Sequence, residues 1–297
     1  MNTSLPRSLS LWLAVTLMLL GGCSQKQPEK IIVGSKFFTE QVVLAELLAQ
    51  QIEARTGIPV ERKTNLGGTL LVQKAMLAGE LDLYVEYTGT ALTTVLNETP
   101  RGDSKSVYER VKKEYAERFG LEVTEPLGFE NTFAMVIRGE DAKKFNLQKL
   151  SDITAFAPKW RAGVGYEFLE RPDGFNGLCE RYNLKFGEKP RVMDLGLIYR
   201  ALVDHQVDVV AGNSTDGLIS ALGLVALEDD RHYFPPYDAV PVVRKATLER
   251  FPALRATLAE LAGRVSAADI RQMNYAVDGL HREPAVVVRE VRKARGL

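Results

Sequence analysis

The chain reads Asp82-Leu83-Tyr84-Val85-Glu86-Tyr87-Thr88-Gly89-Thr90 in the stretch that decides its fold. An apolar pattern typical of a strand runs directly into a carboxylate, an aromatic ring and two hydroxyl groups. These polar groups fall where the strand should end and a helix should begin. Ligands of open α/β sheets bind at such strand ends. We therefore expect part of a binding site at this junction.

The same stretch is repeated later in the chain. Residues 74–92 align without gaps to residues 200–218, and Asp82 then pairs with Asp208 and Thr88 with Ser214. One strand-to-helix unit used twice predicts two lobes that face each other.

The composition is that of an ordinary globular protein. The 297 residues are 45% hydrophobic and 26% charged, and their formal net charge is zero. A chain of this length can form two domains of moderate size. Lys and Arg are scattered among Asp and Glu, so no basic face for nucleic acid is expected.

The N-terminal segment predicts export. Arg7 precedes an apolar run at residues 9–20, which is short for a transmembrane helix and typical of a secretory signal. Leu20-Gly21-Gly22-Cys23 resembles a lipobox, so residues 1–22 are predicted to be a signal peptide and residues 23–29 a polar linker lipidated at Cys23. The expected location is the periplasm or the outer face of the cell membrane, with a lipid anchor. A plain signal peptide with an incidental cysteine is the alternative.

Sites of other kinds are not expected. Once Cys23 is lipidated, only Cys179 is left, so no intramolecular disulfide can form. The three histidines lack metal-ligand spacing, and no nucleotide loop or nucleophile–base pair occurs. The sequence predicts a monomer without cofactor or metal, and not an enzyme.

Strand and helix patterns alternate from residue 31 onward, which predicts α/β lobes with parallel-type sheets and helices on both faces. A proline-rich extended stretch at 233–243 precedes a helical tail. We assign residues 30–132 and 240–297 to the first lobe and residues 133–239 to the second, so the chain crosses between the lobes twice.

Several motifs together resemble the quaternary-amine substrate-binding proteins of ABC importers, the receptors for glycine betaine, choline and carnitine. The motifs are Gly34-Ser35-Lys36, Phe38-Thr39-Glu40-Gln41, Asn65-Leu66-Gly67-Gly68-Thr69, Glu86-Tyr87-Thr88-Gly89-Thr90, Arg171-Pro172-Asp173-Gly174, Ser214-Thr215-Asp216-Gly217, Leu227-Glu228-Asp229-Asp230 and Tyr233-Phe234-Pro235-Pro236-Tyr237. The resemblance implies a bilobal, type II-like periplasmic-binding-protein fold that closes on its ligand at a two-crossing hinge. It also implies delivery of the ligand to a permease in the membrane.

A trimethylammonium group donates no hydrogen bond, and aromatic faces bind it by cation–π attraction. The rings expected at strand ends and cleft loops are Tyr87, Phe133, Tyr199 and Tyr237, with Phe37 and Tyr108 as weaker candidates. Each ring could instead belong to the core.

Polar contacts are expected from the two repeated loops and from the first helix. Helix N-termini bind anions, so Thr88, Thr90, Thr215 and Asp216 are candidates for the polar end of a ligand, with helix capping as the alternative. Gln41 is a further candidate. Glu86 is expected to form a structural ion pair with a basic residue such as Lys36.

Asn213 departs from the family pattern, in which an aromatic residue often precedes the serine. The repeat places Asn213 opposite Tyr87, so the cage is predicted to be one ring short. This predicts weaker binding of a quaternary amine or a ligand with an additional polar group. It also keeps open a receptor of the same fold for an amino acid or another small zwitterion. The export signal argues against a transcriptional regulator.

Overall fold

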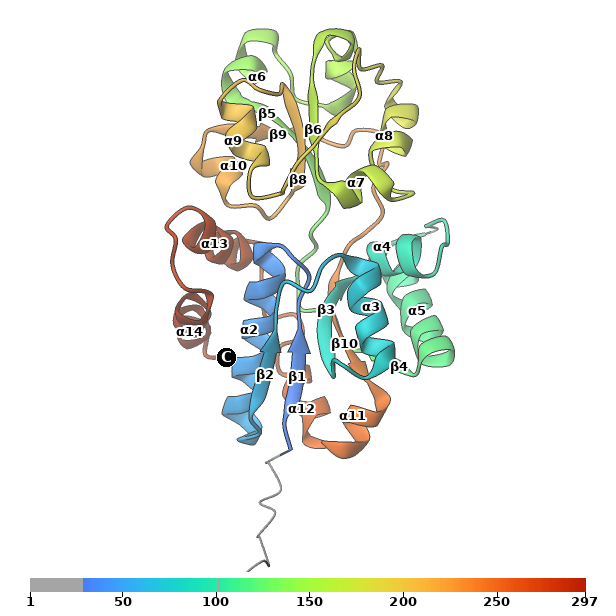
Figure 1. The fold of residues 1–297 in the computed structure, drawn as a ribbon, viewed down its shortest axis with the longest axis vertical. Coiled ribbons are helices and arrows are strands. Elements are labelled where there is room, and N and C mark those ends of the chain that lie inside the picture. The colour runs from blue at the N-terminus through green and yellow to red at the C-terminus, as the bar shows by residue number, and fades with distance from the viewer. Residues whose placement is uncertain (1–28, 101) are drawn as a thin grey trace, which may run out of the picture.

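The computed structural model describes residues 29–100 and 102–297, which form two stacked lobes (Figure 1). Each lobe has a five-stranded sheet, with strand order β2-β1-β3-β10-β4 in lobe 1 and β7-β6-β8-β5-β9 in lobe 2. The predicted signal peptide and Cys23 lie outside the described residues. No helix in the described part of the chain has both the length and the apolar composition to cross a membrane.

Lobe 1 contains the chain up to β4 and the C-terminal helices. Its strands are β1 (Ile31–Gly34), β2 (Val60–Lys63), β3 (Leu83–Tyr87), β4 (Leu121–Val123) and β10 (Ala239–Arg244). Its α-helices are α2 (Thr39–Thr56), α3 (Thr69–Ala78), α4 (Thr88–Thr90), α5 (Ser104–Glu114), α11 (Lys245–Arg250), α12 (Ala253–Ala259), α13 (Ala267–Asp278) and α14 (Pro284–Arg295). Turns of π-helix at Ala91–Val95 and Tyr115–Phe119 extend α4 and α5.

Lobe 2 is smaller. Its strands are β5 (Phe133–Arg138), β6 (Ala162–Val164), β7 (Arg191–Val192), β8 (Val209–Asn213) and β9 (Leu224–Ala226). Its α-helices are α6 (Gly139–Phe145), α7 (Tyr166–Glu170), α8 (Phe175–Tyr182), α9 (Ile198–Val203) and α10 (Leu218–Ala221), with 3₁₀ turns at Leu150–Ala155 and Ala157–Lys159.

Helices cover both faces of the lobe 1 sheet, as predicted. Leu44 and Leu48 of α2 pack with Leu254 of α12 on one face, and Met76 of α3 packs with Val111 of α5 on the other. Apolar burial on both faces is the main stabilising contribution to each lobe.

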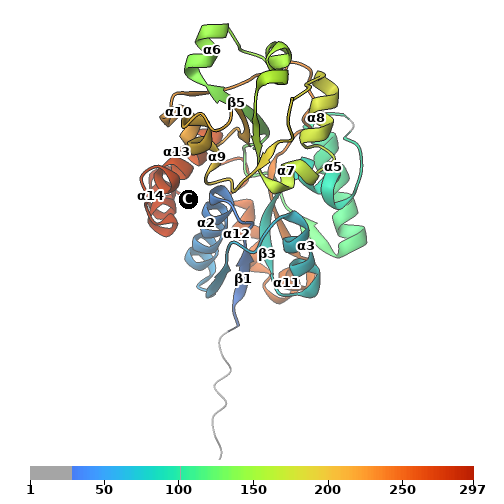
Figure 2. The same cartoon turned by 45° about the horizontal axis from the view of Figure 1, so that its top comes forward.

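The sheets are mixed: the pairings of β1 and β6 are parallel, as the predicted parallel-type sheets require, and the pairings of β10 and β5 are not. β10 runs antiparallel to β3, and β5 runs antiparallel to β8. Each is the first strand after the chain crosses between lobes, so it enters the new sheet from the end nearest the other lobe. Both crossings pass between the lobes near the middle of the molecule (Figures 1 and 2).

The internal repeat is visible in the strands. β3 and β8 occupy equivalent central positions, and each is preceded by an aspartate that fixes the neighbouring strand. Asp82 accepts a hydrogen bond from the Ile32 amide at 2.8 Å, and Asp208 accepts one from the Arg161 amide at 2.9 Å. Both aspartates therefore have a structural role at the start of these strands.

The repeat fails after β8. The repeat pairs Ser214 with Thr88, the first residue of α4, and so predicts a helix from Ser214, but α10 begins only at Leu218. The Asp216 carboxylate accepts a hydrogen bond from the Asn213 amide at 2.9 Å, which closes a turn over these residues. Lobe 2 therefore presents a turn, whereas lobe 1 presents the start of α4.

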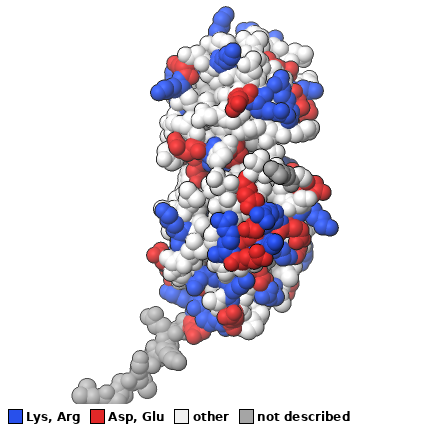
Figure 3. Space-filling view, turned by 90° about the vertical axis from the view of Figure 1, so that its right-hand side faces the viewer, with Lys and Arg blue, Asp and Glu red and all other residues white. Residues whose placement is uncertain are grey.

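The surface carries both signs of charge. On the face shown in Figure 3, Lys and Arg are interleaved with Asp and Glu over both lobes. This arrangement agrees with the net charge of zero.

Candidate functional site

A pocket lies between the lobes, at the ends of β1, β3, β5 and β8. Lobe 1 contributes the loop after β1 and the β3–α4 junction, and lobe 2 contributes α7 and the ends of its strands. The lining residues are Lys36, Phe37, Phe38, Tyr87, Thr90, Asn131, Phe133, Gly165, Tyr166, Glu167, Phe168, Arg171, Leu195, Ala211, Asn213 and Tyr237. The pocket thus occupies the strand-end position that the sequence predicts.

Aromatic rings form much of the wall. The rings of Phe133 and Tyr237 meet edge-to-face with centroids 5.9 Å apart, and Phe38 stacks on Tyr87 at 6.4 Å. Phe168 lies 4.6 Å from Phe133 on the lobe 2 side. The wall therefore offers several π-faces from both lobes to one enclosed volume.

Tyr237 reaches the pocket because the backbone of α4 has no side chain in its way. A Cβ atom on Gly89 would lie 2.6 Å from the Pro236 carbonyl oxygen and 2.7 Å from Cδ1 of Tyr237. Real Cβ contacts are not this short. The glycine in Thr88-Gly89-Thr90 therefore permits the close approach of the crossing segment.

Arg171 forms the charged part of the wall in lobe 2. Its Nε and Nη2 donate to Asp173 at 2.8 and 2.6 Å, and its Nη1 donates to Oγ1 of Thr90 in lobe 1 at 3.1 Å. The guanidinium also lies 5.1 Å from the centroid of the Phe133 ring. A guanidinium has five N–H donors, so within the described structure Arg171 keeps donors free for a further acceptor.

Asp173 joins this arginine to the rings. It accepts hydrogen bonds from the Tyr237 hydroxyl at 2.6 Å and from the Thr93 hydroxyl at 2.9 Å. Burial alone would raise the pKa of Asp173, but the hydrogen bonds and charge of Arg171 outweigh burial and lower that pKa. Asp173 is therefore an anion that fixes Arg171 and Tyr237 and connects lobe 2 to the π-helical turn after α4.

Lys36 is the second cation of the wall. It forms a buried ion pair with Glu86, as the sequence predicts, and its Nζ lies 5.2 Å from the centroid of the Tyr87 ring. The Tyr84 hydroxyl also donates to Glu86, at 3.2 Å. Both cations of the pocket thus have carboxylate partners.

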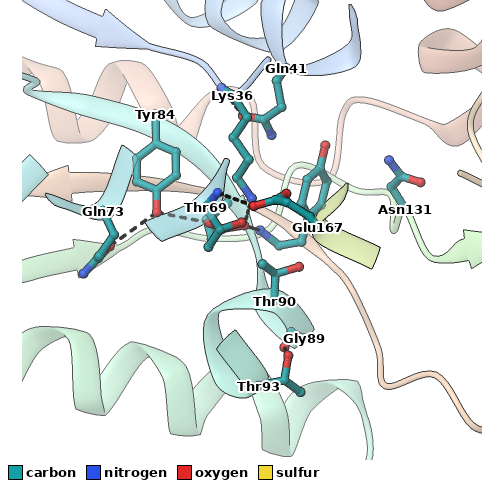
Figure 4. A network of polar contacts seen from close by, with 12 residues as sticks. Lys36, Gln41, Thr69, Gln73, Tyr84, Gly89, Thr90, Thr93, Asn131 and Glu167 are labelled. Carbon is teal, nitrogen blue, oxygen red and sulfur yellow. Dashed lines mark hydrogen bonds and ion pairs between the residues drawn. The ribbon is translucent and has the colours of Figure 1, made fainter. Parts of the chain in front are cut away.

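Glu167 is the lining carboxylate that has no ion pair within the described structure. Its Oε1 accepts a hydrogen bond from the Thr69 amide, at the N-terminus of α3, at 2.7 Å (Figure 4). This bond crosses from lobe 2 to lobe 1. Counted together with Glu86 and Asp173, which neutralise the two cations, the wall carries one uncompensated negative charge, and this favours a cationic group inside it.

The predicted ligand contacts divide into two groups. Tyr87, Thr90, Phe133, Asn213 and Tyr237 all line the pocket, as does the weaker candidate Phe37. In the β5–β8 pairing Phe133 lies opposite Asn213. Cross-strand partners point to the same face of a sheet, so these two side chains reach the pocket together.

The other predicted contacts do not line this pocket. Thr88 binds the crossing segment through Pro236, Thr215 donates to Glu40, and Tyr199 donates to Asp216 at 2.6 Å. Gln41 is buried beside the pocket, where its Oε1 accepts from the Lys36 amide at 3.4 Å.

Tyr108, the remaining weak candidate, packs in the core between α5 and the lobe 1 sheet. It is absent from the lining of the pocket. The alternative that it is simply a core residue is confirmed.

Tyr199 and Asp216 lie in a second hollow that adjoins the pocket. The two share Phe37, Phe38, Leu195 and Asn213 in their linings. Burial raises the pKa of Asp216 to about 6. Asn213, the residue that replaces an expected ring, thus forms part of the wall between the two hollows.

Sequence reasoning did not assign ligand-contact roles to Lys36, Phe38, Asn131, Glu167 and Arg171. Lys36 and Arg171 lie within motifs that the resemblance already quotes, so those motifs contained a usable signal. Glu167 and Asn131 belong to no motif, and only the packing of the two lobes brings them to the pocket.

Comparison with known proteins places this geometry in a family. Residues 29–294 match the family model described as the substrate-binding domain of ABC-type glycine betaine transport systems. The carnitine transport binding protein OpuCC of Listeria monocytogenes is 37% identical over 273 residues, covering 91% of this chain and 87% of that protein. The ergothioneine transport permease/ergothioneine binding protein EgtU of Helicobacter pylori is 32% identical over 297 residues, covering 99% of this chain and 53% of that protein.

The fold agrees as well. A crystal structure of a glycine betaine/carnitine/choline ABC transporter protein superposes with a TM-score of 0.76 at 32% identity, covering 90% of this chain and 99% of that one. The type II-like bilobal fold predicted from the sequence is confirmed. The chain belongs to the family of substrate-binding domains of ABC-type glycine betaine transport systems.

Proposed function

We propose that this protein is an extracytoplasmic receptor that binds a quaternary ammonium compound, such as glycine betaine, choline or carnitine, in the pocket between its lobes. The receptor would then deliver this ligand to an ABC permease. The observation that supports this proposal most strongly is that Tyr87, Phe133 and Tyr237 line one pocket together with Arg171.

The two ends of glycine betaine match two parts of the pocket. A trimethylammonium group is attracted to ring faces with about 0.5–2 kcal/mol per contact, more when water is excluded. The hydroxyls of Tyr87 and Tyr237 stay protonated, because burial and the nearby carboxylates Glu40 and Asp173 raise both tyrosine pKa values well above their usual range. The remaining N–H donors of Arg171 suit a carboxylate.

A larger betaine is a second candidate. Asn213 leaves a small polar side chain in the wall shared with the second hollow, where a ring would have closed it. A betaine with a polar substituent could extend there. Ergothioneine, which the name of the Helicobacter relative mentions, is a trimethylammonium betaine with a thioimidazole ring.

Isothermal titration calorimetry with a ligand series tests the proposal. Glycine betaine, choline, carnitine and ergothioneine should include at least one ligand that binds, and proline should bind more weakly. Dimethylglycine is the matched control, because it keeps the carboxylate and loses one methyl group. Equal affinity for glycine betaine and dimethylglycine, or binding of proline alone, would contradict the cage.

Variants assign the site. Tyr87→Ala or Tyr237→Ala should abolish binding, and Tyr237→Phe should keep the ring and most of the affinity. Tyr108→Ala is the control for lost stability, since Tyr108 is a buried tyrosine of the same lobe outside the pocket. Unchanged affinity in both alanine variants would refute the site.

The lipid anchor at Cys23 remains part of the proposal. Export and lipidation would hold the receptor near its permease without a membrane-spanning segment. Metabolic labelling with a fatty acid should mark the wild-type chain and leave Cys23→Ser unlabelled. Equal labelling of both would show that Cys23 is not the site.

A further inference from the structure

Glu40 has a buried carboxylate at which four segments meet. The residue lies in the first turn of α2 and is 2% exposed. One oxygen accepts from the Tyr87 hydroxyl at 2.5 Å and from Nδ2 of Asn131 at 2.9 Å. The other accepts from the Thr215 hydroxyl and from Nδ2 of Asn274 at 3.2 Å.

These four donors leave the carboxylate no capacity for a ligand. A carboxylate has about four acceptor positions, and neutral protein groups occupy all of them. Within the described structure no cation forms an ion pair with Glu40. Glu40 lines the adjoining second hollow but not the pocket, so it acts on a ligand in the pocket through its partners.

Two of the partners belong to the pocket wall. The Tyr87 ring and the Asn131 amide both line the pocket. An ionised carboxylate accepts hydrogen bonds and donates none, so the Glu40 carboxylate orients the Asn131 side-chain amide with the amide nitrogen toward Glu40. The Asn131 oxygen then has no partner in the described structure, and it is left as an acceptor beside the rings.

A third partner belongs to the other lobe. Thr215 lies in the turn after β8 and is 1% exposed. Asn274 of α13 donates both to Glu40 and, at 3.0 Å, to the Thr215 carbonyl oxygen. The backbone also packs closely here, since a Cβ atom on Gly217 would lie 2.5 Å from Cβ of Tyr275. This turn of lobe 2 is thus bound to lobe 1 through Glu40 and Asn274.

We propose that Glu40 is a positioning residue that couples closure of the lobes to assembly of the pocket wall. The same carboxylate holds the Thr215 turn of lobe 2 and orients Tyr87 and Asn131 toward the ligand. This role rests on the proposed binding function. It predicts that Glu40 slows ligand release, because the Thr215 contact holds the lobes together and must break before the ligand leaves.

The test uses Glu40→Gln, Thr215→Val and the double variant, with glycine betaine as the probe. An amide nitrogen would oppose two donors, so Glu40→Gln should weaken affinity about 10- to 100-fold. The loss should appear in the dissociation rate, with the association rate no lower than that of the wild type. The double variant should bind glycine betaine at most about threefold more weakly than Glu40→Gln, because both substitutions remove the same hydrogen bond between positions 40 and 215.

Glu46→Gln is the matched control, since Glu46 lies on the same helix and its substitution removes an ion pair with Arg62 outside the pocket. It should bind like the wild type. A loss for Glu40→Gln that lies in the association rate, losses that multiply in the double variant, or unchanged affinity would each overturn the positioning role.

Small-angle X-ray scattering separates this inference from the proposed function. If the wild type does not bind glycine betaine, the proposed function loses its main support. The role of Glu40 in holding the lobes together is then tested on the ligand-free protein alone. There the Glu40→Gln variant should be more extended than the wild type and the Glu46→Gln variant should not. Equal compaction of the wild type and Glu40→Gln would then overturn the role of Glu40.

Discussion

Replacing Asn213 with tyrosine should tighten the binding of a small quaternary amine. Asn213 lines the pocket and pairs with Phe133 across the β5–β8 ladder. Side chains at such paired positions have Cβ atoms about 4.5–5.5 Å apart on one face of the sheet. A ring at position 213 would therefore stand beside the Phe133 ring and face the same ligand.

The magnitude follows from one added cation–π contact. Such a contact contributes about 0.5–2 kcal/mol, which corresponds to a dissociation constant about 2- to 30-fold lower. The weak contact that Asn213 makes with Asp216, at 3.4 Å, is the only side-chain hydrogen bond lost within the described structure. The gain should therefore not be offset.

Calorimetry with glycine betaine measures this change, and Asn213→Leu is the control for added apolar volume without a π-face. The Asn213→Tyr variant should bind glycine betaine more tightly than the Asn213→Leu variant. A larger betaine that extends into the second hollow should instead bind Asn213→Tyr less well than the wild type. Equal affinities of the tyrosine and leucine variants for glycine betaine would refute the depleted-cage reasoning.

Three further changes probe other parts of the site. Arg171→Met combined with Asp173→Asn, a pair that leaves no unpaired buried charge, should weaken the binding of glycine betaine about 10- to 100-fold. The binding of choline, which has no carboxylate, should weaken less. Calorimetry with both ligands measures this difference, and equal losses would contradict a carboxylate contact. Gly89→Ala should displace the Tyr237 ring and weaken affinity at least tenfold with the far-UV circular dichroism unchanged, whereas wild-type affinity would show that the close approach is not needed. Asp216→Asn should flatten the pH dependence of unfolding, because the folded-state pKa of Asp216, about 6, exceeds its usual value of 3.8. The contribution of this carboxyl group to stability is therefore full below pH 3.8 and is lost as the pH rises through 6. Urea unfolding measured across this range checks the change, and the same pH slope in both proteins would contradict the raised pKa.

Local patterns predicted the lobes well. The strand that ends at Tyr87 and its repeat that ends at Asn213 are set by apolar alternation and by turn residues close in sequence. The direction of β5 and β10 could not be read in this way, because it depends on how the chain crosses between lobes. The missing helix turn after Asn213 has a local cause, since the Asp216 carboxylate binds the Asn213 amide.

Part of the pocket lining was predictable where chemistry alone selects a residue type. Rings at strand ends were proposed for a cation, and Tyr87, Phe133 and Tyr237 do share one pocket. Glu40 could not be recognised, because an acidic residue in the first turn of a helix is common for electrostatic reasons. Its partner Asn274 lies 234 positions away, and only the folded chain brings the two together.

A crystal structure of the protein with glycine betaine would test the central claim most directly. The account predicts the ammonium nitrogen within about 6 Å of the ring centroids of Tyr87, Phe133 and Tyr237, with the carboxylate turned toward Arg171. A ligand bound outside this pocket, or bound in it with the carboxylate against the rings, would contradict the account.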